Sequence, residues 1–433
     1  MPYHVYRCHI TSVTVLGIVL IIVVSESVVQ SSMDLTPSEN INWKLNYASI
    51  SSIRPLLLLE KCYGIIRVHV IGSSYYIPVD WKMKLFGFLI YLLIAVIYLI
   101  FGIGFTVKTG NFLEAVELLP SILIFFQYSI TIIMQSFSDE DTKRILLSFD
   151  KIDEMLRITM NEEFYKKSRS QTNKLLILLC GSFLVIIIFN IFNEVEIRIG
   201  HVVILFMYFQ CNLEIFTFIK LTDMLQERLF IINNYLTKFT QYQQFNKILT
   251  FHVCVDSVYV DGCVNYIGPV SPSNRKLCDL SATYNKIGEL CQILIKNFCC
   301  LIFTSFISIF SFIIITFWTS LYSFKADKDL RYLLKVIVLS TLEVFIVSMM
   351  CLKCEKILKI RNCTKILVNK IIMNYDLPKS MRIQAKTFME VIEVSPLRVS
   401  IYDMFTIDLQ IIFKFISLCA TYLIVVIQVN HFI

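Results

Sequence analysis

Polar side chains recur along the last apolar stretch of the chain. Lys414, Ser417, Thr421, Ile424 and Gln428 are three or four residues apart, so they share one face of a helix. A polar stripe in apolar surroundings needs water or a polar partner. In a symmetric ring of helices it would line an aqueous path, with Ile424 or Val425 as a constriction that sheds water. In a closed bundle it would form hydrogen bonds between helices instead.

Four ionisable residues interrupt other apolar stretches: Glu214, Lys220, Lys335 and Glu343. An unpaired charge inside a bilayer costs a few kcal/mol, so each one indicates a site. Glu343 lies in the middle of its stretch. As a ligand-binding carboxylate it would favour cationic ligands, and as a structural residue it would pair with a Lys or a hydroxyl of a neighbouring helix. Lys220 and Lys335 lie near stretch ends, where an ammonium group can reach water.

Aromatic residues in the outer halves of the apolar stretches would wall a small-molecule pocket. These are Tyr98, Phe125, Phe126, Tyr208, Phe317 and Trp318. Packing between helices and anchoring at the membrane interface are the alternative roles. With Glu343, they form the predicted ligand-binding set.

Signatures of enzymes, metal sites and nucleic-acid binding are absent from the sequence. It contains no His-Glu-x-x-His and no Gly-x-Ser-x-Gly. Cys351 and Cys354 have no second pair at metal-ligand spacing, and no basic run would follow a phosphate backbone. We therefore expect no enzymatic activity, no metal, no cofactor and no nucleic-acid partner.

Seven apolar stretches carry these residues, and each is long enough for a helix to cross a hydrocarbon layer ~30 Å thick. They are residues 85–106, 118–135, 175–192, 201–221, 298–321, 332–352 and 404–429. The chain is 56% hydrophobic and 17% charged, which is more apolar material than a soluble core of this size buries. The sequence predicts an all-α membrane protein with seven transmembrane helices.

Lys and Arg are distributed unevenly between the connections. The connections 136–174, 222–296 and 352–403 carry twenty-five of them, whereas the alternate connections carry five. Basic connections stay in the cytosol, so the N-terminus is predicted to be cytosolic and the C-terminus extracellular. Helical spacing in 142–160 and 224–239 extends the helices into a cytosolic anchor region, and 256–279 has the composition of a loop.

These observations divide the chain into five parts. They are an atypical apolar extension, 1–32; a cytosolic segment, 33–84; six transmembrane helices with the candidate ligand pocket, 85–352; a cytosolic anchor segment, 353–403; and a seventh helix with the polar stripe, 404–433. The first part has the pattern of a weak secretory signal or a short anchor, which would place Met33 outside the cell. The alternative, a physiological start at Met33, agrees with the charge distribution.

The end of the last stretch reads Thr421-Tyr422-Leu423-Ile424-Val425-Val426-Ile427-Gln428-Val429. It resembles the TYhhhhhQF signature of insect gustatory receptors, where h is hydrophobic, with Val429 in place of the usual Phe. Three further stretches resemble the family: Arg54-Pro55-Leu56-Leu57-Leu58-Leu59 followed by Gly64, Leu225-x-x-Arg228-Leu229-x-x-x-Asn233-x-x-Leu236, and 401–412 with Phe405 and Asp408. The resemblance covers Met33 to the end of the chain.

This resemblance implies a multi-pass plasma-membrane receptor that is a ligand-gated, non-selective cation channel. It implies a homotetramer, or a heterotetramer with related receptors, in which the seventh helices surround the pore among membrane lipid. Tyr422, Gln428 and Val429 then belong to the pore and gate. Sugar-sensing members have Glu after the Thr-Tyr pair, whereas this chain has Leu423, which favours bitter-type or other tastants.

Two other classes of protein share features with this sequence. A G-protein-coupled receptor also has seven helices, but it should show a DRY-like string and NPxxY, and neither occurs. A secondary transporter should show helices broken by Gly or Pro in two matching halves. Only Pro120 falls within a predicted helix, and no such repeat is evident.

Overall fold

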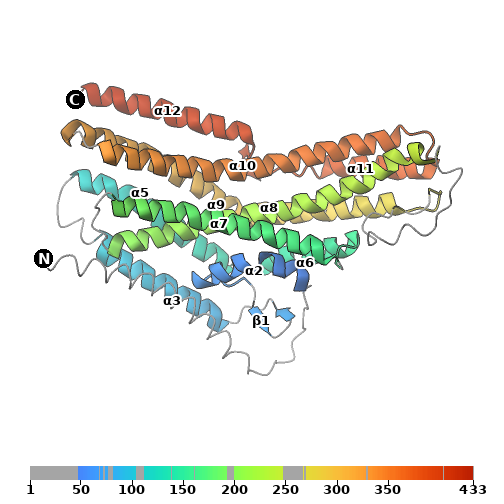
Figure 1. The fold of residues 1–433 in the computed structure, drawn as a ribbon, viewed down its shortest axis with the longest axis horizontal. Coiled ribbons are helices and arrows are strands. Elements are labelled where there is room, and N and C mark those ends of the chain that lie inside the picture. Colours follow the sequence, from blue (N-terminus) through green and yellow to red (C-terminus); the bar gives the residue numbers. More distant parts are fainter. Residues whose placement is uncertain are drawn as a thin grey trace.

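The structure, a computed structural model, is an elongated bundle of helices (Figure 1). It describes residues 47–67, 69–71, 74–76, 81–103, 112–137, 139–159, 161–192, 199–246, 267, 270–327, 330–402 and 404–432. The apolar extension 1–32 lies outside the described residues.

Helices form the described part of six predicted transmembrane stretches and most of the seventh, 404–429, where a short strand precedes the helix and the helix begins only at Leu409. The helices are α3 (Trp81–Ile97), α5 (Phe112–Phe137), α7 (Glu162–Phe192), α8 (Ile199–Asn246), α9 (Lys276–Asp327), α10 (Leu330–Ile372) and α12 (Leu409–Phe432). Within the described residues, five are long and apolar enough to cross a membrane, and α5 and α12 contribute shorter apolar segments. The prediction of an all-α membrane protein is confirmed. One local difference is that the α3 span continues as a π-helix, η2 (Tyr98–Ile103).

The remaining elements are short. They are α2 (Tyr47–Cys62), α6 (Asp139–Leu156), α11 (Lys379–Val394), and two antiparallel strand pairs, β1 (His69–Ile71) with β2 (Ser74–Tyr76) and β3 (Ser400–Ile401) with β4 (Phe405–Thr406). The predicted loop 256–279 ends earlier than expected, because α9 already begins at Lys276.

Three helices run far beyond the thickness of a membrane. α8, α9 and α10 contain 48, 52 and 43 residues and no proline, so at ~1.5 Å per residue they reach about 65–78 Å. Their extra length forms the distal part of the bundle, which we define as α11 with residues 224–246 of α8, 276–297 of α9 and 354–372 of α10 (Figure 1). The predicted extension of the helices beyond the membrane is therefore observed. The ends rich in Lys and Arg lie together, and the assignment of that end to the cytosol stays a prediction.

α8 is the central helix. Every residue from Gln210 to Gln226 is buried, and α10, α5, α9 and α7 surround it. In the distal part, a buried ion pair and its hydrogen bonds join the helices. The guanidinium of Arg228 donates to both carboxylate oxygens of Asp153 at 2.8 Å, and the Asp153 carboxylate also accepts from Tyr165. Because its donors and acceptors are matched, this buried pair avoids the cost of an isolated charge.

Two glycines allow α3 to approach the turn after α2 very closely. Gly64 has φ +85°, a backbone conformation that L side chains rarely adopt. A Cβ added at Gly87 would lie 2.3 Å from the Gly64 carbonyl oxygen. The contact between α3 and this turn therefore has no space for a side chain.

Replacement of Gly87 by Ala is expected to separate α3 from this turn. Backbone cannot yield as a flexible side chain can, so we expect a destabilisation of about 1–3 kcal/mol. The measurement is the thermal unfolding midpoint of the detergent-purified protein. Gly181→Ala in α7 is the matched control, because its added Cβ would meet nothing within 4 Å. Equal midpoints for the two variants would contradict the close contact.

Candidate functional site

A polar cavity lies between α5, α8, α9 and α10. Its lining residues are Ile124, Gln127, Tyr208, Cys211, Asn212, Ile215, Ser305, Ser308, Ile309, Phe312 and Glu343. The cavity has a volume of about 20 Å³, enough for about one water molecule. Its polar groups come from four different helices, so a molecule bound there would contact the whole bundle.

The polar groups of this cavity are partly paired with one another. Gln127 donates to Ser305 Oγ at 2.8 Å, and the Tyr208 hydroxyl donates to the Glu343 carboxylate. Glu343 is 4% exposed, and among the described residues it forms no ion pair with Lys or Arg. The cavity therefore contains a buried carboxylate with remaining capacity to accept hydrogen bonds.

An aromatic cluster lies beside the cavity, between α3, η2 and α5. Tyr98 stacks on Phe125 with ring centroids 4.8 Å apart, and its hydroxyl lies 3.1 Å from Ser121 Oγ. Tyr128 is fully buried, and no hydrogen-bond partner of its hydroxyl is found among the described residues. A buried hydroxyl without a partner costs about 1–3 kcal/mol, so this position would favour a ligand that hydrogen-bonds to it.

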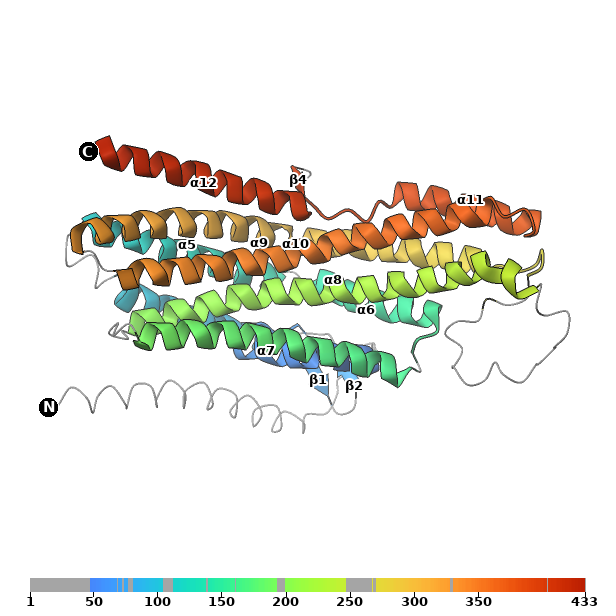
Figure 2. The same cartoon turned by 45° about the horizontal axis from the view of Figure 1, so that its top comes forward.

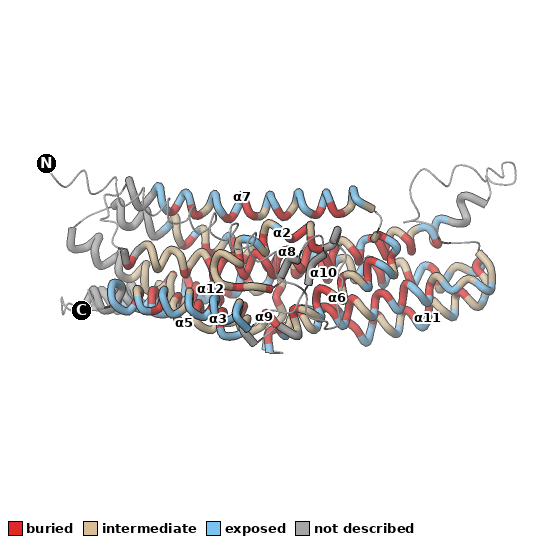
Figure 3. Tube along the Cα trace, turned by 90° about the horizontal axis from the view of Figure 1, so that it is seen from below, coloured by how far each residue is buried: buried red, intermediate tan, exposed pale blue. Residues whose placement is uncertain are grey.

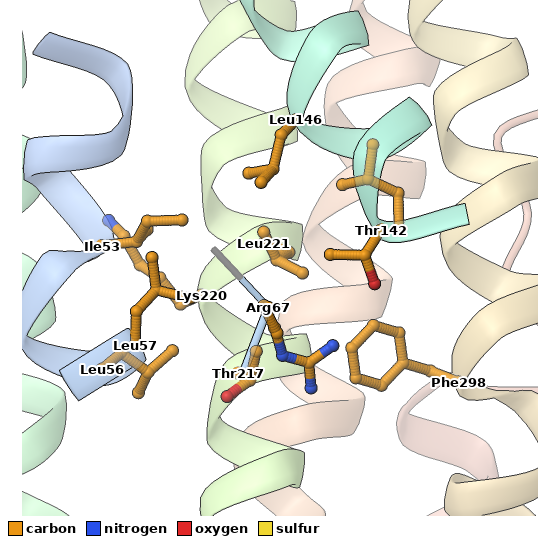
Figure 4. Close-up of a pocket in the computed structure, with 11 residues that line it drawn as sticks. Ile53, Leu56, Leu57, Arg67, Thr142, Leu146, Thr217, Lys220, Leu221 and Phe298 are labelled. Carbon is orange, nitrogen blue, oxygen red and sulfur yellow. The ribbon is translucent and has the colours of Figure 1, made fainter. Parts of the chain in front are cut away.

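A second cavity, also about 20 Å³, surrounds Arg67 near the start of the distal part (Figure 4). Arg67 donates to the buried carboxylates of Glu60 and Glu214 and to Gln135, and its guanidinium lies 5.7 Å from the centre of the Phe298 ring. Burial alone would lower the pKa of Arg67, but the two carboxylates outweigh burial and raise it. Arg67 therefore stays charged and joins α2, α5, α8 and α9.

Lys220 also lines this second cavity, and its predicted exposure to water was wrong. It is fully buried, and its ammonium donates to the backbone oxygen of Ser168 at 3.0 Å and to Ser168 Oγ at 2.9 Å. α2 and α7 cover the position that would otherwise open to water. The side chain of Lys335 is outside the described residues.

α12 packs on α9 and α10 with one face only. Ile412, Phe415 and Cys419 are buried, and aromatic contacts follow the α9 side, with Phe415 against Phe306 and Tyr422 5.5 Å from Phe310. The opposite face is exposed in the single chain. It carries Lys414, Ser417, Thr421, Ile424, Val425 and Gln428.

The N-terminus of α12 is held by two carboxylates. Asp408 Oδ1 accepts from the backbone N–H of Ile411 at 3.1 Å, which caps the helix. Glu355 of α10 accepts from the backbone N–H of Leu409, also at 3.1 Å. Negative charge is favourable at a helix N-terminus, so α10 and α12 are coupled at this point.

Similarity to known proteins assigns the chain to a family. A family model described as 7tm chemosensory receptor matches residues 82–430. The chain belongs to this family of chemosensory receptors. It is therefore a multi-pass membrane protein, as predicted. A comparison with curated proteins finds no significant match.

Two solved structures resemble the receptor in fold. Both are of the insect olfactory receptor OR5 from Machilis hrabei, one of them in complex with eugenol. Their TM-scores are 0.55 and 0.50, at 11% and 12% sequence identity. In both cases the match covers 89% of the receptor and all of the OR5 chain.

The receptor brings together some of the predicted ligand-binding residues and separates others. Tyr208 and Glu343 line the polar cavity, and Tyr98 and Phe125 form the neighbouring aromatic pair. Phe126 is 60% exposed on the outside of the single chain. Phe317 and Trp318 are half-buried near the end of α9 and do not line the cavity. Of the predicted pore residues, Val429 lies beyond the described side chains.

Sequence reasoning missed several residues that line the cavity, namely Gln127, Asn212, Ser305 and Ser308. A signal was present in the sequence. On α8 and α9 the lining residues recur at intervals of three and four, as in Ser305, Ser308, Ile309 and Phe312. The stripe on α12 has the same spacing, which indicates a polar face in these helices as well.

Proposed function

We propose that the receptor is a subunit of a ligand-gated, non-selective cation channel of the gustatory class. The observation that carries this proposal is the polar face of α12, which is exposed opposite the face that packs on α9 and α10. The match to the chemosensory receptor family and the resemblance of 421–429 to the gustatory signature support it. In this proposal Lys414, Ser417, Thr421 and Gln428 face the ion path, with Ile424, Val425 and Val429 near the gate.

The proposal includes assembly into a homotetramer or a heterotetramer with related receptors. In a single chain, the exposed stripe on α12 would face lipid, at a cost of several kcal/mol per unsatisfied polar or charged group. Four copies of α12 around an axis place the stripe in water and remove that cost. An active purified particle with the mass of one subunit would contradict this assembly.

The ligand is proposed to be a small-molecule tastant that binds in the polar cavity lined by Tyr208 and Glu343. Ligand pockets usually measure about 300–1,000 Å³, so the cavity of about 20 Å³ must widen to admit one. Widening moves α5, α8, α9 and α10 apart, and the α10 contact from Glu355 passes this movement to α12. A ligand that binds the widened state better shifts the receptor towards it. The buried carboxylate favours protonated amines, and Leu423 argues against the glucose and sucrose type.

The test is current recording from cells that express the receptor alone, with a panel of protonated amines and neutral aromatic compounds. We expect ligand-evoked cation current that persists when G-protein signalling is blocked. Glu343→Gln should raise the half-maximal concentration of amine ligands about tenfold to a hundredfold, the loss expected for one charge-assisted hydrogen bond of about 1.5–3 kcal/mol.

Glu289→Gln is the matched control, because Glu289 is exposed in the distal part of α9. It should leave the half-maximal concentration unchanged. Current that disappears when G proteins are blocked would overturn the channel proposal and favour a G-protein-coupled receptor. Transport of the ligand without channel current would favour a transporter.

A further inference from the structure

A group of basic side chains lies on the outer face of α7. Lys166, Lys167, Arg169 and Lys174 are all exposed, and we call them the basic collar. Among the described residues none of the four forms an ion pair or a hydrogen bond. Figure 3 shows the exposed residues along the outer edge of α7 and the buried ones along its inner edge. Four cationic groups therefore point away from the bundle without a protein partner.

The surroundings of the basic collar carry more positive than negative charge. Glu162 and Glu163 are exposed in the first turn of α7, four residues before Lys166 and Lys167, and α7 contains no Asp or Glu after them. α2 packs against it, with the Thr172 hydroxyl donating to the backbone oxygen of Ser52 at 2.7 Å. α2 contributes the exposed Arg54, while its only acidic residue, Glu60, is fully buried. The five exposed cations of this face outnumber Glu162 and Glu163, so its net charge is positive, most clearly from Arg169 to Lys174, and it would concentrate anions.

The same face of α7 becomes apolar directly after Lys174. Ile177 is 71% exposed and Leu184 is 58% exposed, which marks the surface that faces hydrocarbon. Lys174 therefore lies at the level of the lipid headgroups. α12 lies on the opposite side of the bundle from α7 (Figure 2), so an assembly centred on α12 leaves the basic collar at the lipid boundary.

The length of the basic collar along the helix axis distinguishes between classes of anionic lipid. Lys166 lies eight residues before Lys174, which is about 12 Å along the helix axis. A headgroup layer is only about 5–8 Å thick on each side of the hydrocarbon, so a headgroup level with the bilayer surface meets Lys174 and not Lys166. A headgroup that carries phosphates above this surface meets the whole collar.

We propose that the basic collar is a binding site for the phosphorylated headgroup of an inositol phospholipid in the adjacent leaflet. Phosphates of the headgroup pair with the exposed ammonium and guanidinium groups, and the acyl chains lie against Ile177 and Leu184. The proposal uses the predicted cytosolic position of this end of the bundle. It does not require channel activity, so its test is separate from that of the proposed function.

The test uses full-length receptor in nanodiscs of phosphatidylcholine. Binding of short-chain phosphatidylinositol 4,5-bisphosphate is measured for the wild type and for the variant K166Q/K167Q/R169Q/K174Q. We expect the variant to bind at least about tenfold more weakly, since it lacks four of the cationic groups that attract an anionic headgroup. Wild-type binding should weaken at high salt. Size-exclusion chromatography establishes that the variant is folded, and these exposed residues make no internal contact that folding needs.

The matched control is K365Q/K370Q/K379Q/K386Q, which removes the same charge from exposed positions in α10 and α11 in the distal part. It should bind the lipid as the wild type does. Equal loss in the control would show that net charge alone matters and would overturn the site. Equal binding by the collar variant and the wild type would also overturn the site. Equal affinity for phosphatidylserine, or for free inositol 1,4,5-trisphosphate, would overturn the assignment to an inositol phospholipid.

Discussion

Replacing Arg67 with Met is expected to reduce the amount of folded receptor strongly. Glu60 and Glu214 are both fully buried, and Arg67 is the cation that pairs with each of them. Removing one partner of a buried ion pair costs about 3–5 kcal/mol, because the remaining charge stays in a medium of low dielectric constant. Here one substitution leaves two carboxylates without their cation. A loss of this size is comparable to the whole stability of many domains.

The measurements are the amount of receptor at the cell surface and the thermal unfolding midpoint in detergent. Arg67→Lys should recover only part of the loss, because one ammonium group cannot reproduce the several hydrogen bonds of a guanidinium. Arg144→Met is the control, since Arg144 is exposed on α6. It should behave as the wild type does.

A compensating variant tests the electrostatic cause directly. Glu60→Gln with Glu214→Gln, added to Arg67→Met, removes both charges that Arg67 neutralised. This triple variant should be more stable than Arg67→Met alone, because neutral amides cost less to bury than unpaired carboxylates. A triple variant that is less stable than the single variant would show that Arg67 acts through packing against Phe298 and not through charge.

The helices could be predicted from the sequence because their signal is local. A run of apolar residues such as 298–321 determines its own helix, and each of the seven runs contains a helix in the structure, although the last helix begins at Leu409 and not at 404. The helices α6 and the far end of α8 were visible in the same way, since apolar residues recur at helical spacing in 142–160 and 224–239. The extensions of α9 and α10 were not predicted from spacing. The polar face of α12 was also predictable, because residues 414–428 belong to one helix.

The contacts between helices could not be predicted in this way. Glu214 was recognised as an ionisable residue in an apolar run, but its partner Arg67 is 147 positions away in a segment with no pattern of its own. Lys220 was expected to reach water because it lies near the end of an apolar stretch. Only the placement of α2 and α7 shows that Ser168 and its backbone cover it. Spacing identifies the face of a helix, and the partner of that face depends on the packing of the whole bundle.

The attachment of α12 suggests where its gate lies. The N-terminus is fixed by Asp408 and by Glu355 of α10, and aromatic contacts with α9 continue as far as Tyr422. Beyond Tyr422, Ile424 and Val425 are 56% and 47% exposed in the single chain. In the proposed tetramer this last part of α12 is held mainly by the other copies of α12. It is therefore the part that can separate when the pocket widens.

Ile424→Ser and Val429→Ser are expected to raise the current that flows without ligand. A narrow apolar ring excludes ions because water leaves it, and four hydroxyl groups would keep it wet. A change of about 1.4 kcal/mol in the balance between closed and open states gives about tenfold more leak. Gln428→Ala should instead change single-channel conductance or ion selectivity, with little effect on ligand potency. Single-channel recording compares these variants with Leu178→Ser, a control on the lipid-facing side of α7. If leak and selectivity are the same in all four variants, the constriction lies elsewhere in the channel.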